Sequence, residues 1–310
     1  MSNLLNRIKE SSKYVSDNSK YVKINYEKID EIIEGGEFNA IRYWLDTNPF
    51  NILDMNYRDI VNFLLLYHTI GDYCFWGDPK WEIDTEVGKL DGSYAIMYIL
   101  INRFRNNNDM NMSYEEFADM LKGNVEIPLL KERYNCLVEM NKYLDSIGKD
   151  FYDEIKDLKV DIDLLDYVVS TFSYFKDETN YNGVNVYFYK RAQLLVSDIL
   201  HVRKMLENIE VDYSNLMGCA DYKIPQVMNA LGMLEYEYDL EYKLARKEEL
   251  QEDSIEEIEI RANDLVVIDY IYEKLNREVC RIDINDYIWL LGQDKSKINK
   301  NYHRTRTIHY

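Results

Sequence analysis

Proline and glycine are scarce in this chain of 310 residues, which contains 4 Pro and 12 Gly. Because these residues interrupt helices and mark turns and linkers, their scarcity favours long helices and argues against a flexible interdomain linker. Cysteine is also scarce, and the four positions, 74, 136, 219 and 280, include no close pair. This spacing excludes a Cys-x-x-Cys metal or redox motif and does not suggest a disulfide scaffold.

Positive charge is in short supply as well. The chain has 37 Lys and Arg against 56 Asp and Glu, for a net charge of −19. Proteins that bind nucleic acids do so largely through Lys and Arg, which neutralise phosphates. Stable binding to DNA, RNA or an anionic membrane is therefore disfavoured. A small anionic ligand remains compatible with this composition, since it needs only one or two cations.

Long apolar runs are missing too. The most apolar segment, residues 60–70, includes Asn62 and His68 and is too short to span a membrane. Residues 1–20 are polar and lack the apolar core of a signal peptide. We therefore expect a cytoplasmic protein without membrane association.

The sequence also has no GxGxxG, Walker or GxSxG motif and no His/Cys cluster, so we expect no nucleotide cofactor and no metal.

The apolar periodicity predicts a mainly α-helical fold with at most a few short strands. Helices are expected within residues 1–45 and over residues 57–70, 94–104, 190–206 and 260–275, and a further helix is expected to open at Ser113. A short strand or extended segment is expected at 184–189. Residues 246–260 are rich in acids and read as a solvated face or mobile connection. We expect one domain over residues 1–310, with 1–55 as a helical extension packed on it.

The helix that opens at Lys190 carries a polar stripe opposite its apolar face. Gln193, Ser197 and His201 follow Lys190 at helical spacing. A solvated polar face is the ordinary explanation of such a stripe. A lysine next to the free N–H groups of a helix N-terminus also suits a phosphate, and the sequence leaves both interpretations open.

The segment 219–226 presents a similar choice. Asp221 precedes a short helix with Pro225 near its start, so its carboxylate is either a helix cap or a group directed into a pocket. In the second case it could stabilise a developing positive charge, while Tyr222, Lys223 and Gln226 supply a ring face and polar contacts.

Two further segments bear on ligand binding. Phe75, Trp76 and Trp81 lie in a turn and are either packing residues or a platform for a flat heterocycle, and Ser93 and Tyr94 could add an edge contact. The basic end of the chain, residues 303–310, is expected to dock on carboxylates of the body.

These segments together resemble the queuosine-salvage protein family, the queuosine 5′-phosphate N-glycosylase/hydrolases. The resemblance runs in family order from about residue 10 to the C-terminus. The matching stretches are Phe75-Trp76, Gly92 to Tyr94, Pro128 to Arg133, Phe188 to Asp198, Ala220 to Gln226, Glu257 to Arg261 and His303 to Tyr310.

The resemblance implies a fold similar to helix-hairpin-helix DNA glycosylases and release of the 7-deazaguanine base queuine. It places Asp221 on a base-contacting aspartate and Lys190 on the lysine of the site. The family tends to carry an aspartate shortly before a Leu-Trp pair, but here that place holds Asn285, and Asp286 follows. Asp286 is the preferred carrier of that role.

The resulting hypothesis is an N-glycosidase that hydrolyses queuosine 5′-monophosphate or queuosine. A carboxylate would stabilise the oxocarbenium character that develops on the ribose. One alternative is a helical module that binds a modified nucleoside without cleaving it, and a weaker one is a repair-type DNA glycosylase. The candidate catalytic residues are Asp221 and Asp286, and the candidate substrate-binding residues are Phe75, Trp76, Ser93, Tyr94, Lys190, Tyr222, Lys223, Gln226 and Asn285.

Overall fold

The computed structural model describes residues 4–40, 50–106, 110–158, 160–294 and 298–310. The fold is mainly α-helical, as the periodicity predicts. The helices are α1 (Leu4–Asp17), α2 (Tyr26–Glu34), η1 (Glu37–Ala40), α3 (Tyr57–Ile70), α4 (Gly92–Asn106), α5 (Tyr114–Met120), α6 (Leu130–Ile147), α7 (Phe151–Ile155), α8 (Asp161–Thr171), η3 (Ser173–Phe175), α9 (Lys190–Glu207), α10 (Lys223–Ala230), α11 (Tyr238–Ala245), α12 (Ile255–Lys274) and α13 (Arg281–Leu291).

The strands form three small antiparallel pairs. Two of the pairs are local hairpins, whereas β1 and β6 are far apart in the sequence and place Val22 opposite Tyr236. The extended segment expected at 184–189 is confirmed as β5. The pairs are β1 (Val22–Ile24) with β6 (Leu234–Tyr236), β2 (Glu82–Thr85) with β3 (Gly88–Asp91), and β4 (Glu178–Tyr181) with β5 (Val184–Tyr187).

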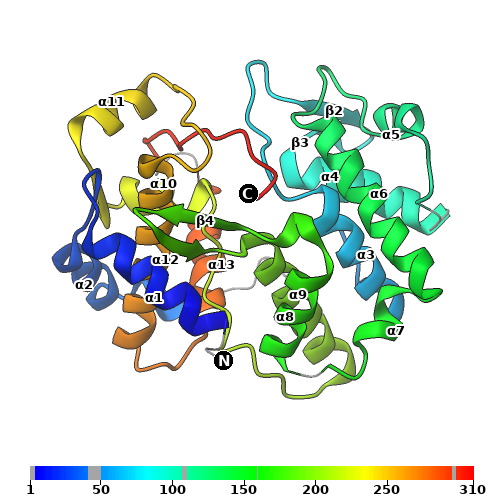
Figure 1. The fold of residues 1–310 in the computed structure, drawn as a ribbon, viewed down its shortest axis with the longest axis horizontal. Helices are drawn as coiled ribbons and strands as arrows, with labels where there is room; N and C mark the ends of the chain where they lie inside the picture. The colour runs from blue at the N-terminus through cyan, green and yellow to red at the C-terminus, as the bar shows by residue number, and fades with distance from the viewer. Residues whose placement is uncertain (1–3, 41–49, 107–109, 159, 295–297) are drawn as a thin grey trace.

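The helices gather in two groups with the β4–β5 hairpin between them (Figure 1). In one group α12 packs against α1, α10 and α13. In the other, α3 packs against α4, α6, α7 and α9. The C-terminal segment runs between the groups (Figure 1), so residues from the two groups face each other across the middle of the molecule.

Helix α3 lies at the centre of the second group because it is apolar on nearly every side. All of its residues from Phe63 to Ile70 are buried, as is typical of a helix enclosed by others. Asn56 caps its start by accepting a hydrogen bond from Asp59 N. The helix ends at Gly71, where no side chain fits, because a Cβ there would lie 2.5 Å from Tyr67 O.

Helix α12 corrects one expectation. Residues 246–260 were expected to be a solvated face or mobile connection. Most of residues 246–253 are exposed, as expected, but α12 begins at Ile255 and buries Glu257 and Glu259. Glu259 is satisfied because it accepts hydrogen bonds from Lys20 N, Tyr21 N and the Tyr181 hydroxyl. The acids therefore bond to distant parts of the chain, which local composition cannot reveal.

The N-terminal residues are helical as expected, with the short strand β1 added. α1 packs against α12, and β1 pairs with β6. Residues 41–49 lie outside the described part of the chain, so the expectation for residues 1–45 is met over 4–40 apart from that strand. Among the described residues, no helix combines the length and apolar character needed to cross a membrane. The similarity to helix-hairpin-helix glycosylases stays a prediction.

Candidate active site

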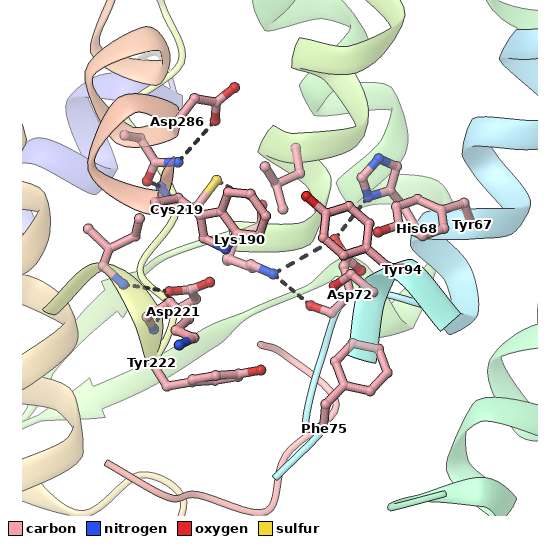
Figure 2. Close-up of a pocket in the computed structure, with 16 residues that line it drawn as sticks. Tyr67, His68, Asp72, Phe75, Tyr94, Lys190, Cys219, Asp221, Tyr222 and Asp286 are labelled. Atoms are coloured by element: carbon pink, nitrogen blue, oxygen red, sulfur yellow. Dashed lines mark hydrogen bonds and ion pairs between the residues drawn. The ribbon is translucent and has the colours of Figure 1, made fainter. Parts of the chain in front are cut away.

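A pocket lies between the two helix groups, with walls from α3, α4, α9, α10 and α13. It brings together nine of the eleven residues singled out in the sequence. Figure 2 shows Asp286 on one side, Tyr222 and Phe75 on the other, and Lys190 between them. The nine are Phe75, Ser93, Tyr94, Lys190, Asp221, Tyr222, Lys223, Asn285 and Asp286.

The backbone leading to Asp221 is held by buried side chains from two helices. Gln193 of α9 accepts hydrogen bonds from Met217 N at 2.6 Å and Gly218 N at 3.3 Å, and its amide donates to Gly218 O at 2.9 Å. Asn285 of α13 accepts from Cys219 N at 2.9 Å. Gly218 has φ +125°, and a Cβ there would lie 2.9 Å from the side chain of Ile268, so only glycine fits this turn.

Arg261 of α12 completes this support. Its Nε donates to Ala220 O at 2.9 Å, while its two terminal nitrogens bond Asp177 at 3.0 and 2.6 Å. Both side chains are almost fully buried. Asp221 thus sits at the end of a segment with little freedom to move, and such preorganisation is what a catalytic group requires.

Asp221 acts as a cap and also lines the pocket, so both interpretations from sequence hold. Its Oδ1 accepts hydrogen bonds from Lys223 N at 2.7 Å and Ile224 N at 3.0 Å, at the start of α10. The carboxylate faces the pocket (Figure 2). Backbone N–H donors stabilise a carboxylate charge, so this group is suited to face a developing cation.

Lys190 lies on the pocket wall, and the polar stripe that it begins is buried. Gln193, Ser197 and His201 are buried with it, so the solvated-face interpretation is wrong. The backbone N–H of Lys190 donates to the Asp177 carboxylate at 3.4 Å. Its ammonium donates to Asp72 O at 2.6 Å and lies 3.8 Å from the Asp72 carboxylate.

His68 lies between two buried carboxylates behind Lys190. Its Nδ1 is 2.9 Å from Asp72 Oδ2 and its Nε2 is 2.9 Å from Asp198 Oδ2. Burial alone would lower the pKa of His68, but the two carboxylates outweigh it and raise the pKa above its ordinary value. Burial likewise opposes ionisation of Asp72, yet Lys190 and His68 hold the pKa of Asp72 well below its usual range.

Asp286 occupies a different electrostatic environment from Asp221. Burial raises the pKa of Asp286 to about 8, and the nearby carboxylate of Asp198 adds to the shift. Asn285 donates to Asp286 Oδ1 at 3.3 Å while its other end binds Cys219 N. The raised pKa favours the protonated form of Asp286, which is the form that can donate a proton.

Trp76 and Gln226 do not line the pocket, which corrects two expectations. The indole N–H of Trp76 donates to Thr305 O at 3.2 Å, and its ring lies against Arg304 and Arg306. Gln226 donates to Lys300 O at 2.6 Å. Both side chains hold the C-terminal segment in place, because they point away from the pocket toward residues that are distant in sequence.

Some pocket residues were missed by the sequence interpretation. His68 and Asp72 carried a signal, since a polar pair four residues apart at the end of an apolar helix has to find partners inside the protein. The other missed residues lie in stretches of sequence that are typical of a protein core, so nothing in the sequence indicated that they line a site. The missed residues are Tyr67, His68, Asp72, Leu194, Cys219, Ile224 and Trp289.

The described part of the chain holds no group of three or more His, Cys, Asp or Glu side chains arranged to bind a metal ion.

The basic C-terminal segment docks on the body as expected. Arg306 lies 3.5 Å from Glu249, Thr307 bonds Glu252, and the Tyr310 hydroxyl donates to Glu257 at 2.7 Å.

A family model described as queuosine salvage protein matches residues 52–310. The chain belongs to the queuosine salvage protein family. All residues that line the pocket fall within the matched range, so the pocket is part of the family's common domain. In this member of the queuosine salvage family, two carboxyl groups of contrasting character, Asp221 and Asp286, share that pocket.

Similar curated proteins extend over almost the whole chain. A Sphaerobacter thermophilus protein is 30% identical over 97% of this chain and 96% of its own length. A Bos taurus protein is 27% identical over 97% of this chain and 98% of its own, and a Dictyostelium discoideum protein is 26% identical over 99% and 100%. Each is named queuosine 5′-phosphate N-glycosylase/hydrolase.

Proposed function

We propose that this queuosine salvage family member hydrolyses the N-glycosidic bond of queuosine 5′-monophosphate and releases queuine for salvage. The observation that carries the proposal is the contrast between Asp221 and Asp286 in one pocket. Asp221 accepts two backbone N–H bonds, whereas burial raises the pKa of Asp286 to about 8. Glycoside hydrolysis commonly uses two carboxyl groups, one that stabilises the cation on the sugar and one that donates a proton to the leaving group.

In the proposed reaction the bond between ribose C1′ and the base nitrogen breaks, and a water oxygen becomes attached to C1′. The carboxylate of Asp221 stabilises the positive charge on the ribose as that bond lengthens. A 7-deaza base has no N7 to protonate, so the proton from Asp286 goes to another edge of the leaving base, and the proton that the attacking water loses restores the Asp286 carboxyl. The products are queuine and ribose 5-phosphate.

The aromatic side chains hold the base in this proposal. Phe75 stacks on Trp81, with ring centres 6.5 Å apart, and Tyr222 packs on Tyr302 at 5.0 Å. Each of these two pocket residues thus has a second aromatic ring packed against it. Ser93 and Tyr94, in the first turn of α4, add contacts at the base edge. Stacking of this kind supports recognition of a flat heterocycle.

We also propose that residues 1–310 act as one domain, with 1–55 as a helical extension. The packing of α1 on α12 and the pairing of β1 with β6 support this organisation.

One assay tests the function. Purified protein is incubated with queuosine 5′-monophosphate and, separately, with queuosine, and mass spectrometry follows queuine and the sugar product. We expect queuine and ribose 5-phosphate in equal amounts from the nucleotide. Binding of both compounds without any release would instead support the non-catalytic binding module, which the presence of Asn285 at the family's aspartate position makes a real alternative.

A further inference from the structure

The polar face of α9 extends well beyond Lys190, the one residue of that face that lines the pocket. Ser197, Asp198 and His201 lie further along the helix, and all three are buried. Ionisable side chains such as Asp198 and His201 are rarely buried without partners, because they lose their hydration. The partners of these two residues therefore indicate what this part of the helix does.

His201 links α9 to α13. Its Nδ1 donates to Ser197 O, one turn earlier on α9, at 2.8 Å, and its Nε2 lies 3.3 Å from Asp283 Oδ1 on α13. Burial alone would lower the pKa of His201, but the hydrogen bonds with Asp283 and Ser197 outweigh it and raise the pKa. The charged form of the ring is thus favoured at the point where the two helices meet.

The contact between His201 and Asp283 fixes how the two helices face each other. Residues three positions apart share one face of a helix. Asp198 therefore lies one turn from His201 on α9, and Asp286 lies one turn from Asp283 on α13. The pocket is lined by residues of α9 that precede Asp198 and by residues of α13 from Asn285 onward. Asp198 and Asp286 are thus neighbours on the pocket side of the contact.

Asp198 is held from its other side by His68. The Nε2 of His68 lies 2.9 Å from Asp198 Oδ2, and its Nδ1 lies 2.9 Å from Asp72 Oδ2. Asp198 has no exposed surface. The carboxylate of Asp198 is therefore fixed beside Asp286 by a ring that comes from a third helix, α3.

Asp286 accordingly has neighbours of opposite sign on α9. Burial is the main reason that the pKa of Asp286 is raised to about 8, while Asp198 raises this pKa further and His201 lowers it. Two smaller effects come from α13 itself, where the hydrogen bond from Asn285 lowers the pKa and the carboxylate of Asp283 raises it.

The other ionisable groups around Asp286 contribute little to this balance. Burial raises the pKa of the Tyr213 hydroxyl and of the Cys219 thiol, so both groups are neutral at the pH where Asp286 titrates. The ammonium of Lys190 donates to Asp72 O and lies 3.8 Å from the Asp72 carboxylate. The two residues of α9 are thus the main charged neighbours of Asp286.

We propose that Asp198 and His201 are positioning residues that act on Asp286 with opposite sign. The carboxylate of Asp198 retains the proton of Asp286, and the imidazole of His201 favours its release. This rests on the proposed function, in which Asp286 gives a proton to the leaving base. A general acid has to hold its proton at the operating pH and still give it up in the transition state. One helix, α9, adjusts both properties.

The test measures how kcat/KM for queuosine 5′-monophosphate depends on pH in wild type, Asp198→Asn and His201→Gln. The rate falls at high pH because the reaction needs the proton of Asp286. Asp198→Asn removes a like charge, so the fall should begin about one pH unit lower. His201→Gln removes an opposite charge, so the fall should begin about one pH unit higher. The control Glu207→Gln removes an exposed carboxylate of the same helix and should leave the fall in place.

Shifts in opposite directions cannot come from a general loosening of the fold, which would act in the same direction in both variants. Shifts of the same sign, or a fall that neither substitution moves, would overturn the proposal. In these cases queuine is still released, so the proposed function survives. If Asp198→Asn does not fold, His201→Gln alone decides, since a structural defect gives no reason for a shift to higher pH.

If the wild type releases no queuine, the function fails and stability tests the two residues instead. The effect of Asp286→Asn on Tm is then followed from pH 6 to 10 in wild type, Asp198→Asn and His201→Gln. Ionisation of a buried carboxyl destabilises the fold, so this effect should change at a lower pH in Asp198→Asn and at a higher pH in His201→Gln. A change at the same pH in all three backgrounds would reject the proposal.

Discussion

The guanidinium of Arg261 and the carboxylate of Asp177 form a buried ion pair with two parallel contacts, at 3.0 and 2.6 Å. Each partner also holds one side of the pocket. Asp177 accepts from Lys190 N, and Arg261 donates to Ala220 O beside Asp221. The pair therefore sets the relative positions of the two segments that the sequence singled out.

Removing one partner of that pair should be costly. Arg261→Met leaves the Asp177 carboxylate buried without its counter-charge, so we expect the free energy of unfolding to fall by about 3–5 kcal/mol in urea denaturation. Arg277→Met, which breaks the exposed pair with Glu273, is the matched control and should leave stability almost unchanged. Equal effects of the two substitutions would contradict the importance of the buried pair. Adding Asp177→Asn to Arg261→Met should recover part of the loss.

Asp221→Asn should slow queuine release by at least about 100-fold, equivalent to about 2.7 kcal/mol of barrier. The amide oxygen of asparagine can still accept from Lys223 N and Ile224 N, so the start of α10 and Tm should be preserved. Single-turnover rates with excess enzyme measure the loss. Unchanged turnover would remove Asp221 from the catalytic residues.

The dependence of rate on pH tests Asp286. Because its pKa is raised to about 8, its proton is present at pH 7 and is lost above pH 8. We expect kcat/KM to be level between pH 6 and 7 and to fall roughly tenfold per unit well above pH 8. Asp286→Asn should be slow and should lack this decline. A wild-type rate that rises through pH 8 would show that Asp286 works as a carboxylate instead.

The same group affects stability. A carboxyl whose pKa is higher in the folded than in the unfolded protein stabilises the fold fully at low pH, and this contribution is lost as pH rises through the folded value, here about 8. Asp286→Asn cannot ionise, so its Tm relative to wild type should increase between pH 6 and pH 9. A difference in Tm that does not vary with pH over this range would be inconsistent with a raised pKa.

His68→Gln should destabilise the protein most at low pH. The pKa of His68 is raised by Asp72 and Asp198 against the opposing effect of burial. Its charge therefore stabilises the fold fully below the unfolded value of about 6.5, and this contribution is lost as pH rises through the higher folded value. The melting temperatures of wild type and variant, measured from pH 5.5 to 9, should converge as pH increases. A difference in melting temperature that does not change with pH would mean that His68 stabilises only as a neutral group.

Local signals were enough to predict the elements whose ends are marked in the sequence. Residues 57–70 form α3 as expected, since an apolar run with helical character stops there at a glycine. The start of α9 at Lys190 was likewise visible in the change of period. The pairing of β1 with β6 was not, because Val22 and Tyr236 are brought together only by the rest of the fold.

The candidate site divides in the same way. Residue type and family order identified Lys190, Asp221 and Asp286, all of which line one pocket. They could not tell Phe75 from its neighbour Trp76, because side chains in a turn point in directions that depend on what packs around them. Nor could they reveal His68 between Asp72 and Asp198, since Asp198 is 130 positions away.

From the order of its residues alone, this chain is a mainly helical member of the queuosine salvage family with an acidic surface and a few chemically distinctive segments. Those properties follow from periodicity, composition and short motifs, which are local. The raised pKa of Asp286 and the contact between Lys190 and Asp72 followed only from folding, because burial and long-range contacts set them. The pocket that Asp221 and Asp286 share exists only once distant segments of the chain are packed together.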